Sequence, residues 1–413
     1  MKVIILDSVT FGLNHIADAA IGMGVELYLF THNRSLYRYE LENGAEGRVT
    51  VVDVDTFDPD AVYQAAKALG KVDGVINLTD TWCTHAIVLA EKLGLPAQNL
   101  SCINRIRNKS KLRNHLYENN LTSGPSLYIK AYDLAERVQL EKQNYPAIIK
   151  EVSGTGSRHV WLANDLDSAI AKISEIREKF FQGELTVEPY FQGSLYSVET
   201  LTWAGKTKVL AITSRKMSDE PLFREDGLSL PVYFPEAERQ VIDTWISKVL
   251  ESLDYNIGFA HTEFVITTNG MEVVEVNPRM GGAMVGEMLV RSFETNILKA
   301  HIELALGQRP EVMDQELTVK KGCANYLVYA KETGSYNDID PGDAFSRFPG
   351  KPEFYSTIHA GKRIEHTDEY RALVGIIVTE GSTSEIAQIN ANAAANRIAT
   401  RVQRISPLTT KMS

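Results

Sequence analysis

Two periods of apolar residues alternate along the first hundred residues of the chain. Short apolar runs rich in β-branched residues predict strands at residues 2–6, 25–30, 49–54 and 74–78. Between them, apolar residues recur at helical spacing and predict helices at residues 12–23, 59–69 and 84–93. This alternation of strand and helix predicts a small parallel α/β sheet.

The ends of these strands carry few signals for a cofactor. Gly12, Gly22 and Gly24 do not form GxGxxG at the first strand-to-helix turn, which disfavours a dinucleotide site. Thr79 and Asp80 follow the strand at 74–78, at the edge where open α/β sheets bind ligands. A helix N-cap explains the same two residues, and we favour that interpretation.

Residues 105–119, RIRNKSKLRNHLYEN, form a basic segment with helical spacing. Lys109 and Lys111 could meet phosphate groups from this segment. Basic residues at helical spacing more often form a solvated helix face, and the spacing alone favours that simpler interpretation.

A stronger signal begins at residues 145–150, YPAIIK, an apolar strand that ends in Lys150. The next residues place glycines among hydroxyl side chains, in the order Ser153, Gly154, Thr155, Gly156 and Ser157, and another strand is predicted at 159–162. The amides and hydroxyls of such a hairpin can lie over phosphates. It is not a Walker A loop, because no GK[ST] follows and the next element is a strand. A flexible surface hairpin is the alternative.

Further strands are predicted at residues 185–190, 196–203 and 209–214, followed by a helix at 236–252. The intervening residues 217–231 are polar and carry Glu220, Arg224, Glu225 and Asp226. A polar loop of this length inside a compact domain is usually a lid or a linker.

Residues 260–282, AHTEFVITTNGMEVVEVNPRMGG, predict a β-hairpin that turns at Asn269-Gly270. With a three-residue loop, Glu263 faces Glu275 and His261 faces Asn277, because side chains alternate along a strand. A two-residue loop would separate the carboxylates unless a bulge compensates. We expect the opposite face of the hairpin to lie in a core; it carries Phe264, Ile266, Val274 and Val276, while Val265 and Val273 share the carboxylate face.

Facing carboxylates destabilise a sheet, so this pattern indicates a bound cation. Glu263, Glu275 and Asn277 offer only oxygen ligands, which suit Mg²⁺ or Mn²⁺ better than zinc. Arg279 adds a five-donor fork, and Gly281-Gly282 precede a helix predicted at 283–293, where amides form an anion site. An exposed hairpin with a solvated acidic face is the simpler alternative.

The composition limits the kinds of molecule that the protein is expected to bind. The 413 residues indicate two to four domains, and 44% hydrophobic with 23% charged residues is typical of a globular protein. A net charge of −10, without dense basic runs, argues against a nucleic-acid partner. Cys83, Cys102 and Cys323 are widely spaced and indicate reduced, cytoplasmic thiols rather than disulfides or a zinc site. The sequence predicts neither a signal peptide nor a membrane span.

The order of these motifs along the chain matches that of a known protein superfamily. Lys109 after a leading α/β domain, YPAIIK with SGTGS, the hinge-like VEPYFQG and the hairpin HTEF with EVNPRMGG resemble the ATP-grasp superfamily over about residues 105–300. Within it, the EVNPRMGG ending and a small terminal unit look like the L-amino-acid ligases that join amino acids into dipeptides, including the dapdiamide-forming ligases of antibiotic pathways.

The resemblance implies an ATP-grasp fold with α/β and α+β domains. Its implied parts are an N-terminal parallel α/β domain (1–108), a lid subdomain (109–190), a metal-binding catalytic subdomain (191–318) and a small α+β domain (319–413). In the last part, strands with Gly and Pro turns start near Gly322, and a helix is predicted at 383–402.

The resemblance also implies roles for the nucleotide contacts. Lys109 and Lys150 would contact ATP phosphates, with the loop of Ser153, Gly154, Thr155, Gly156 and Ser157 closed over them. Glu188 and the backbone near Tyr190 would hold the adenosine. Leu195 stands where many members have a ribose-binding glutamate, and Glu199 is a possible substitute.

At the other end of the implied site, Glu263, Glu275 and Asn277 would bind Mg²⁺ or Mn²⁺. Arg279 would face the transferred phosphoryl group and act with Lys150 in catalysis. Contacts to the substrates are expected from Gly281, Gly282, Glu225 and His261, and a hydrogen bond is expected of His261 rather than metal ligation.

The implied reaction joins a carboxylate to an amine through an acyl phosphate, giving an amide or dipeptide, ADP and phosphate. Alternatives are another carboxylate–amine or carboxylating ligase of the superfamily, of the purine-pathway type, and a non-catalytic ATP-binding regulatory protein. The intact set of Lys150, Glu263, Glu275, Asn277 and Arg279 disfavours the last. Small-molecule substrates, a cytoplasmic location and a homodimer are expected from the resemblance.

Overall fold

The computed structural model describes residues 1–8, 11–130, 134–154, 159–179, 182–220, 222–339, 345–367, 370–398 and 401–403. The N-terminal part has the predicted parallel sheet, in the order β3-β2-β1-β4. Its strands are β1 (Lys2–Leu6), β2 (Glu26–Thr31), β3 (Val49–Asp53) and β4 (Gly74–Ile76). Its helical segments are α1 (Leu13–Met23), η1 (Arg34–Tyr37), α2 (Arg38–Glu40), η2 (Leu41–Ala45), α3 (Pro59–Ala68) and α4 (Cys83–Lys92).

The basic segment at 105–119 is not one helix, as predicted, but parts of two. Asn108 has extended backbone angles between α5 (Leu100–Arg107) and α6 (Lys109–Glu118), and its side chain accepts from the Lys111 amide at 2.9 Å. An asparagine that caps a helix stabilises a new start more than a continued turn. The break puts Lys109 in the first turn of α6, and its side chain is buried.

The lid subdomain is an antiparallel sheet in the order β5-β8-β6-β7. Its elements are β5 (Leu127–Ile129), α7 (Leu134–Leu140), β6 (Ala147–Glu151), β7 (Val160–Ala163), α8 (Leu166–Lys179) and β8 (Leu185–Pro189). β6 and β7 pair on either side of the glycine-rich residues, as the sequence predicts.

The largest sheet of the described residues has eight antiparallel strands in the order β13-β12-β9-β10-β11-β14-β18-β16. These are β9 (Ser194–Trp203), β10 (Lys206–Met217), β11 (Glu225–Leu230), β12 (Ile257–Thr267), β13 (Gly270–Asn277), β14 (Gly322–Tyr329), β16 (Glu353–Ser356) and β18 (Leu373–Gly381). The prediction of a loop throughout 217–231 is wrong, because β11 pairs with both β10 and β14 and becomes a central strand.

The same pairing joins the C-terminal strands to the large sheet. β14, β16 and β18 extend this sheet beyond β11, so the strands after residue 318 are paired with it. The predicted helix at 383–402 is also too long: α12 (Ser384–Ala395) ends early, and β19 (Arg401–Gln403) joins a small sheet with β15 (Gly334–Asp338) and β17 (Arg363–Ile364). The remaining helical segments are α9 (Glu236–Ser252), α10 (Val285–Phe293), α11 (Lys299–Ala305), η3 (Glu311–Met313) and η5 (Tyr370–Ala372).

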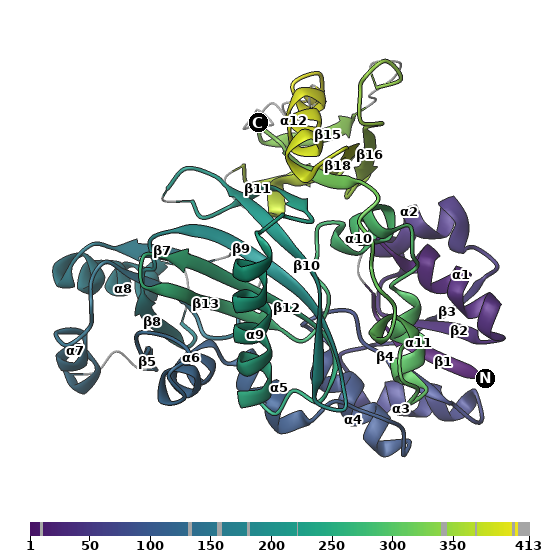
Figure 1. The fold of residues 1–413 in the computed structure, drawn as a ribbon, viewed down its shortest axis with the longest axis horizontal. Coiled ribbons are helices and arrows are strands. Elements are labelled where there is room, and N and C mark those ends of the chain that lie inside the picture. Colours follow the sequence, from purple (N-terminus) through teal and green to yellow (C-terminus); the bar gives the residue numbers. More distant parts are fainter. Residues whose placement is uncertain are drawn as a thin grey trace, which may run out of the picture.

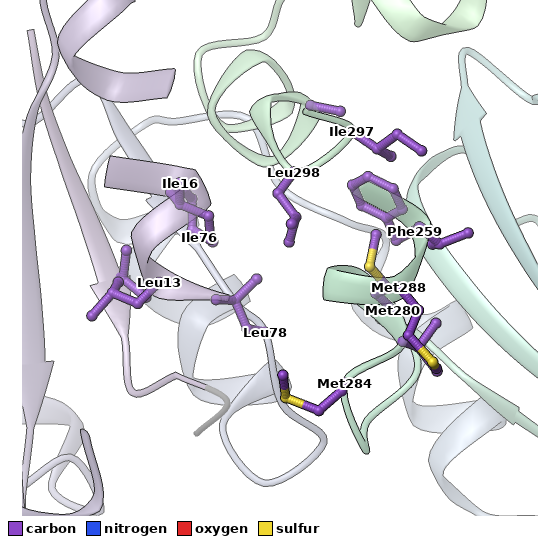
Figure 2. Packing of buried hydrophobic residues seen from close by; sticks show 14 of the residues in the cluster. Leu13, Ile16, Ile76, Leu78, Phe259, Met280, Met284, Met288, Ile297 and Leu298 are labelled. Carbon is purple, nitrogen blue, oxygen red and sulfur yellow. The ribbon is translucent and has the colours of Figure 1, made fainter. Parts of the chain in front are cut away.

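Figure 1 shows the N-terminal sheet at one end of the molecule, the lid strands at the other and the large sheet between them. α9 packs on one face of the large sheet through buried aliphatic residues such as Ile246 and Leu250. On the side of the N-terminal sheet, Leu298, Met288, Leu13 and Ile76 belong to one buried apolar cluster, and Figure 2 shows Leu298 between Leu13 and Ile76 on one side and Met288 on the other. Apolar contacts therefore fix both α9 and the N-terminal sheet against the large sheet. No helix within the described ranges has the length and apolar content needed to cross a membrane.

Candidate active site

The β12–β13 hairpin has the predicted carboxylate register, reached by an unpredicted route. Its loop has two residues, because Thr267 pairs with Gly270. The register then shifts between Glu263 and Phe264, and this bulge restores the pairing of Glu263 with Glu275 and of His261 with Asn277. The predicted facing carboxylates are confirmed. The compensating bulge, one of the two open alternatives, is what produces them.

The bulge changes which valine lies in the core. Val273 packs with Phe264 in the core under α9, although the simple alternation placed Val273 on the carboxylate face and Val274 in the core. Val274 is the unpaired residue of the bulge, and its carbonyl oxygen lies 3.5 Å from the Lys150 ammonium. The bulge therefore turns a backbone acceptor toward Lys150.

Each facing carboxylate has a cationic partner. Glu275 Oε1 lies 3.1 Å from the Lys109 ammonium, and Glu263 Oε1 lies 3.1 Å from the Arg215 guanidinium. Burial would raise the pKa of the Glu263 carboxyl, but Arg215, His261 and Lys109 outweigh burial and hold that pKa well below its usual range. The Glu263 carboxylate is therefore held ionised, and each of the two carboxylates already lies against a cation.

Arg215 is a site residue that the sequence prediction missed. It lies in β10, and its second amino group contacts Glu225 at 3.0 Å, while its Nε finds no hydrogen-bond partner among the described residues. The predicted strand ended one residue earlier, at 214, and a lone arginine beside a polar loop carries no motif. Only the register of β10 in the sheet brings it to Glu263.

Glu199 and Gly281 both lie against the Nδ1 edge of the His261 ring. Glu199 faces His261 across the β9–β12 pair, contacts its Nδ1 and accepts from the Gly281 amide at 2.9 Å. A Cβ on Gly281 would lie 2.8 Å from His261 Nδ1, so only glycine allows this approach. These contacts place Glu199 at the metal end of the site, and its predicted ribose contact stays a prediction.

The charge of His261 follows from its neighbours. Burial would lower the pKa of the His261 ring, but Glu199 and Glu263 raise it to about 9 against the opposing charge of Arg215. Nε2 lies 3.1 Å from an Arg215 nitrogen and 3.5 Å from Glu263 Oε1. With the ring protonated, Nε2 donates to Glu263, and Arg215 pairs with the carboxylates instead of the ring.

Arg279 is oriented by the N-terminal part of the chain. Its Nε donates to Asp80 Oδ2 at 2.7 Å, NH2 contacts the same oxygen, and Arg107 lies 3.5 Å from Asp80 Oδ1. The N-cap interpretation of Asp80 is wrong, since Trp82 precedes α4 and no side chain caps that helix. Asp80 instead lies at the sheet edge where α/β folds bind ligands, and it connects that edge to the EVNPRMGG segment.

A second charged cluster lies under the lid. Glu188 Oε2 contacts Lys150 at 2.9 Å and Arg113 at 3.1 Å, and all three side chains are buried. Burial and the neighbouring Lys109 and Arg113 lower the pKa of Lys150, against the attraction of Glu188. Burial would raise the pKa of Glu188, but Lys150 and Arg113 lower it. Glu188 Oε1 has no hydrogen-bond partner among the described residues and is free to accept one.

The structure describes the first two residues of the predicted nucleotide loop, Ser153 and Gly154. Ser153 and Gly154 follow β6, and the Gly154 carbonyl accepts from the Lys109 ammonium at 2.5 Å. Thr155, Gly156 and Ser157 lie outside the described residues. On the hinge side, the Tyr190 hydroxyl contacts Glu220, and its ring meets Phe223 edge-on with centroids 6.2 Å apart. The turn after β10 thus reaches the hinge where the adenosine is expected.

The other candidate substrate residues lie around Arg215. Glu225 begins β11, with one carboxylate oxygen on Arg215 and the other buried without a hydrogen-bond partner among the described residues. Burial raises the pKa of Glu225 above its ordinary value, against the attraction of Arg215. Gly282 follows Gly281 in open space and leads to Ala283 and Met284, whose φ angles of 50° and 70° delay the start of α10 to Val285.

The residues fit a divalent cation and a triphosphate. Among the described residues, no group of three or more His, Cys, Asp or Glu is arranged around one point. The candidate set is two facing carboxylates with the Asn277 amide, all oxygen donors suited to Mg²⁺ or Mn²⁺. Its charge is balanced here by the Lys109 and Arg215 side chains, which a bound cation would release. Both released groups could then meet phosphate oxygens.

Fold and sequence agree on the class of protein. Residues 143–287 match the ATP-grasp domain family. The chain therefore contains an ATP-grasp domain, and the whole described structure has the ATP-grasp fold.

The chain is similar to several known proteins. The crystal structure of an L-amino acid ligase from Bacillus licheniformis superposes with a TM-score of 0.81 at 22% identity, covering 98% of both chains. The uncharacterized protein y4rH of Sinorhizobium fredii is 24% identical over 81% of this chain and 70% of its own length. Carnosine synthase 1 of Homo sapiens is 23% identical over 58% of this chain, and the match spans 31% of that longer protein.

Proposed function

We propose that the protein is an ATP-dependent ligase that activates the carboxylate of an amino acid or a similar acid and joins it to the amine of another amino acid. The products are an amide or dipeptide, ADP and phosphate. The observation that carries this proposal is the half-buried pair of Glu263 and Glu275, flanked by Lys109 and Arg215 from two other segments. A solvated acidic face would not be enclosed by cations in this way.

Phosphoryl transfer needs positive charge around the β- and γ-phosphates. Lys109 and Lys150 supply two ammonium groups, of which Lys109 donates to the Gly154 carbonyl of the glycine-rich residues and Lys150 lies in β6 just before them. Glu263, Glu275 and Asn277 would hold Mg²⁺ or Mn²⁺, which supplies Lewis-acid neutralisation of the transferred phosphoryl charge when bound. Attack by a substrate carboxylate on the γ-phosphorus then gives an acyl phosphate.

Arg279 is the second source of electrostatic stabilisation. Asp80 and the Met280 carbonyl, at 2.7 and 2.9 Å, fix the orientation of its guanidinium. A preoriented donor is most effective where negative charge develops during reaction, because it needs no reorganisation. We assign Arg279 to the transferred phosphoryl group and to the tetrahedral intermediate that forms when the amine attacks the acyl carbon.

Glu225 supports an amino acid as the activated acid. Its unpaired buried oxygen is an acceptor for a cationic group, and the raised pKa of the Glu225 carboxyl would fall when an ammonium binds. A simple carboxylic acid lacks that ammonium. The likeness to a protein named an L-amino acid ligase and to one named a carnosine synthase supports the same substrate class.

One screen tests the proposal. Purified protein with ATP and Mg²⁺ is given every pair of proteinogenic amino acids, and released phosphate, ADP and the coupled product are measured. We expect at least one pair to give product, ADP and phosphate in equal amounts, and the Glu275→Gln variant serves as the blank. ATP binding without phosphate release for any pair would instead identify a nucleotide-binding regulatory protein.

A further inference from the structure

The C-terminal part of the chain brings a tyrosine to the candidate active site. Tyr370 lies at the start of η5, directly before β18, and the residue is 40% exposed. The negative charge of Glu225 and the positive charge of Arg279 both act on its hydroxyl group. These are the residues assigned above to the ammonium of the activated acid and to the transferred phosphoryl group. Tyr370 therefore lies beside the place where the acid is expected.

Hydrogen bonds on both sides of Tyr370 hold η5 in place. On one side, the Thr367 carbonyl accepts from an Arg224 amino group at 3.3 Å. On the other side, the Ala372 carbonyl accepts from the Ala330 amide at 2.9 Å. The position of Tyr370 is therefore set by contacts with distant parts of the chain and does not depend on its own short helical turn.

The residues that hold η5 lie around Glu225. Arg224 directly precedes Glu225, and its guanidinium lies 4.0 Å from the centre of the Tyr329 ring. The Tyr329 hydroxyl donates to the Glu225 carbonyl at 2.7 Å. Burial raises the pKa of Tyr329, and Tyr370 and Glu225 raise it further, against the charge of Arg224. Tyr329, Tyr370 and Glu225 therefore form one cluster at the start of β11.

The Tyr370 hydroxyl can act as a hydrogen-bond donor. Burial of this group and the negative charge of Glu225 raise the pKa of Tyr370 to about 12, against the positive charge of Arg279, so the hydroxyl keeps its proton at pH 7. Within the described residues, no hydrogen bond occupies this hydroxyl. Because the residue is partly exposed, a small molecule can reach it without a rearrangement of the core.

The neighbouring charges indicate which chemical group binds beside Tyr370. Glu225 supplies a negative charge and Arg279 a positive one, and the hydroxyl lies in the field of both. An amino acid carries the complementary pair, an ammonium and a carboxylate joined to one carbon. With the ammonium toward Glu225 and the carboxylate toward Arg279, a hydroxyl donor stabilises the carboxylate through a charge-assisted hydrogen bond.

We propose that Tyr370 binds the amino acid that is activated, donating a hydrogen bond from its hydroxyl to the carboxylate while the ammonium faces Glu225. The inference rests on the function proposed above. It adds a residue of the C-terminal part of the chain to the substrate site. The hydroxyl serves the first half of the reaction, in which the acid is activated, and the amine substrate is not expected to use it.

Tyr370→Phe tests the proposal, because it removes the hydroxyl and keeps the ring. Tyr233→Phe is the matched control, the same change at a tyrosine that is 84% exposed. Each proteinogenic L-amino acid is supplied as the acid with ATP and Mg²⁺, and hydroxylamine replaces the amine, so the hydroxamate formed reports activation alone. Melting temperatures show whether both variants fold.

The comparison uses the amino acid that gives the wild type its highest hydroxamate yield. Its KM should rise about tenfold or more in Tyr370→Phe, the usual effect of losing one hydrogen bond to a charged group. The KM for ATP should stay within about twofold, and Tyr233→Phe should behave as the wild type does. An unchanged KM for this amino acid would overturn the inference. So would unchanged hydroxamate formation combined with a raised KM for the amine in the coupling reaction.

The outcomes separate this inference from the proposed function. If hydroxamate forms equally well with both variants, the inference is overturned and the function stands. If no amino acid gives a hydroxamate, the function fails, and binding of each amino acid is measured by calorimetry with Mg²⁺ and a non-hydrolysable ATP analogue. Weaker binding by Tyr370→Phe than by Tyr233→Phe then supports the inference, whereas equal binding, or no binding by either, overturns it.

Discussion

The two faces of the β12–β13 hairpin are both largely buried, yet they differ completely in chemistry. One face packs Phe264 and Val276 against α9, and the other gathers His261, Glu263 and Glu275. Buried apolar groups add stability roughly in proportion to the area removed from water. Buried ion pairs add little, because the loss of hydration offsets their attraction. Burial alone therefore does not separate a structural residue from a functional one; the balance of charges does.

The comparison leads to opposite expectations for the two faces. Substitutions on the apolar face should change the free energy of unfolding and leave the rate per folded molecule nearly unchanged. Substitutions on the charged face should change the rate far more than the stability. Four experiments test this division, in order of decreasing expected effect.

The largest effect is expected from Glu275→Gln, which removes one of the facing carboxylates and leaves the shape of the side chain. We expect phosphate release to fall about 10³-fold or more, because charge stabilisation at the transferred group is lost. His261→Ala should cost less, since we expect that ring to position its neighbours. Excess chelator should stop the wild type to the same extent as the substitution.

Glu272→Gln is the matched control on the same strand. Glu272 is buried and accepts from the Thr122 hydroxyl at 2.6 Å and from the Ser123 amide, away from the facing carboxylates. Its substitution should lower the melting temperature and leave phosphate release per folded molecule within about twofold. Equal loss of activity in Glu272→Gln and Glu275→Gln would remove the distinction between the two positions.

On the apolar face, Phe264→Ala should lower the free energy of unfolding by about 3–5 kcal/mol, the usual cost of deleting a buried aromatic ring. Denaturant titration measures this change, and phosphate release is compared at a temperature where the variant stays folded. Phe57→Ala is the control, because that ring is 55% exposed and should cost less than about 0.5 kcal/mol. An inactive but stable Phe264→Ala protein would contradict the division.

The third prediction concerns the effect of His261 on how stability changes with pH, measured on protein without metal or nucleotide. The pKa of the folded-state ring, about 9, lies above its ordinary value of 6.5, so the protonated ring stabilises the fold. This stabilisation is complete below about pH 6.5 and is lost as the pH rises through 9, a change on the order of 3 kcal/mol. His261→Gln should remove that decline, whereas His359→Gln, at an exposed position, should keep it. If the stability of the wild type instead rises between pH 6.5 and 9, the His261 ring is neutral in the folded protein and this prediction is wrong.

The smallest of the four effects is expected from Lys150→Ala. The ammonium is buried beside Glu188, and Lys150 lies in β6 just before the glycine-rich residues, so its loss should weaken ATP binding and slow turnover by about 10–100-fold. Lys111→Ala, an exposed lysine of α6, serves as the control for charge alone. Unchanged ATP affinity and rate in Lys150→Ala would exclude Lys150 from the site.

The sequence predicted local pairings well and distant contacts poorly. Alternation and the Asn-Gly turn placed Glu263 opposite Glu275 on the condition of a three-residue loop or a bulge, and no residue type shows in advance that the bulge is what forms. The contact of Arg279 with Asp80 joins residues 199 positions apart, and local signals favoured an N-cap role for Asp80 instead. Such contacts depend on how whole elements pack, which periodicity does not encode.

Local composition also gave no signal for the strand β11 or for the break between α5 and α6. β11 begins with Glu225, Asp226 and Gly227, residues that are rare in strands and typical of loops, yet its edges pair on both sides. Asn108 interrupts a continuous helical pattern because its side chain caps the next helix. At β11 strand pairing outweighs the low strand propensity of the residues, and at Asn108 helix capping outweighs the continuous helical pattern. Both segments lie next to residues of the candidate site.

The most direct test of the account replaces the amine with hydroxylamine. ATP, Mg²⁺ and the acid substrate are mixed with the wild-type protein, and the hydroxamate and the nucleotide products are measured together. If the cations around Glu263 and Glu275 direct attack to the γ-phosphorus, the hydroxamate of the acid should appear with an equal amount of ADP and phosphate. Formation of AMP and pyrophosphate would contradict the acyl-phosphate mechanism and the arrangement of charges from which it is inferred.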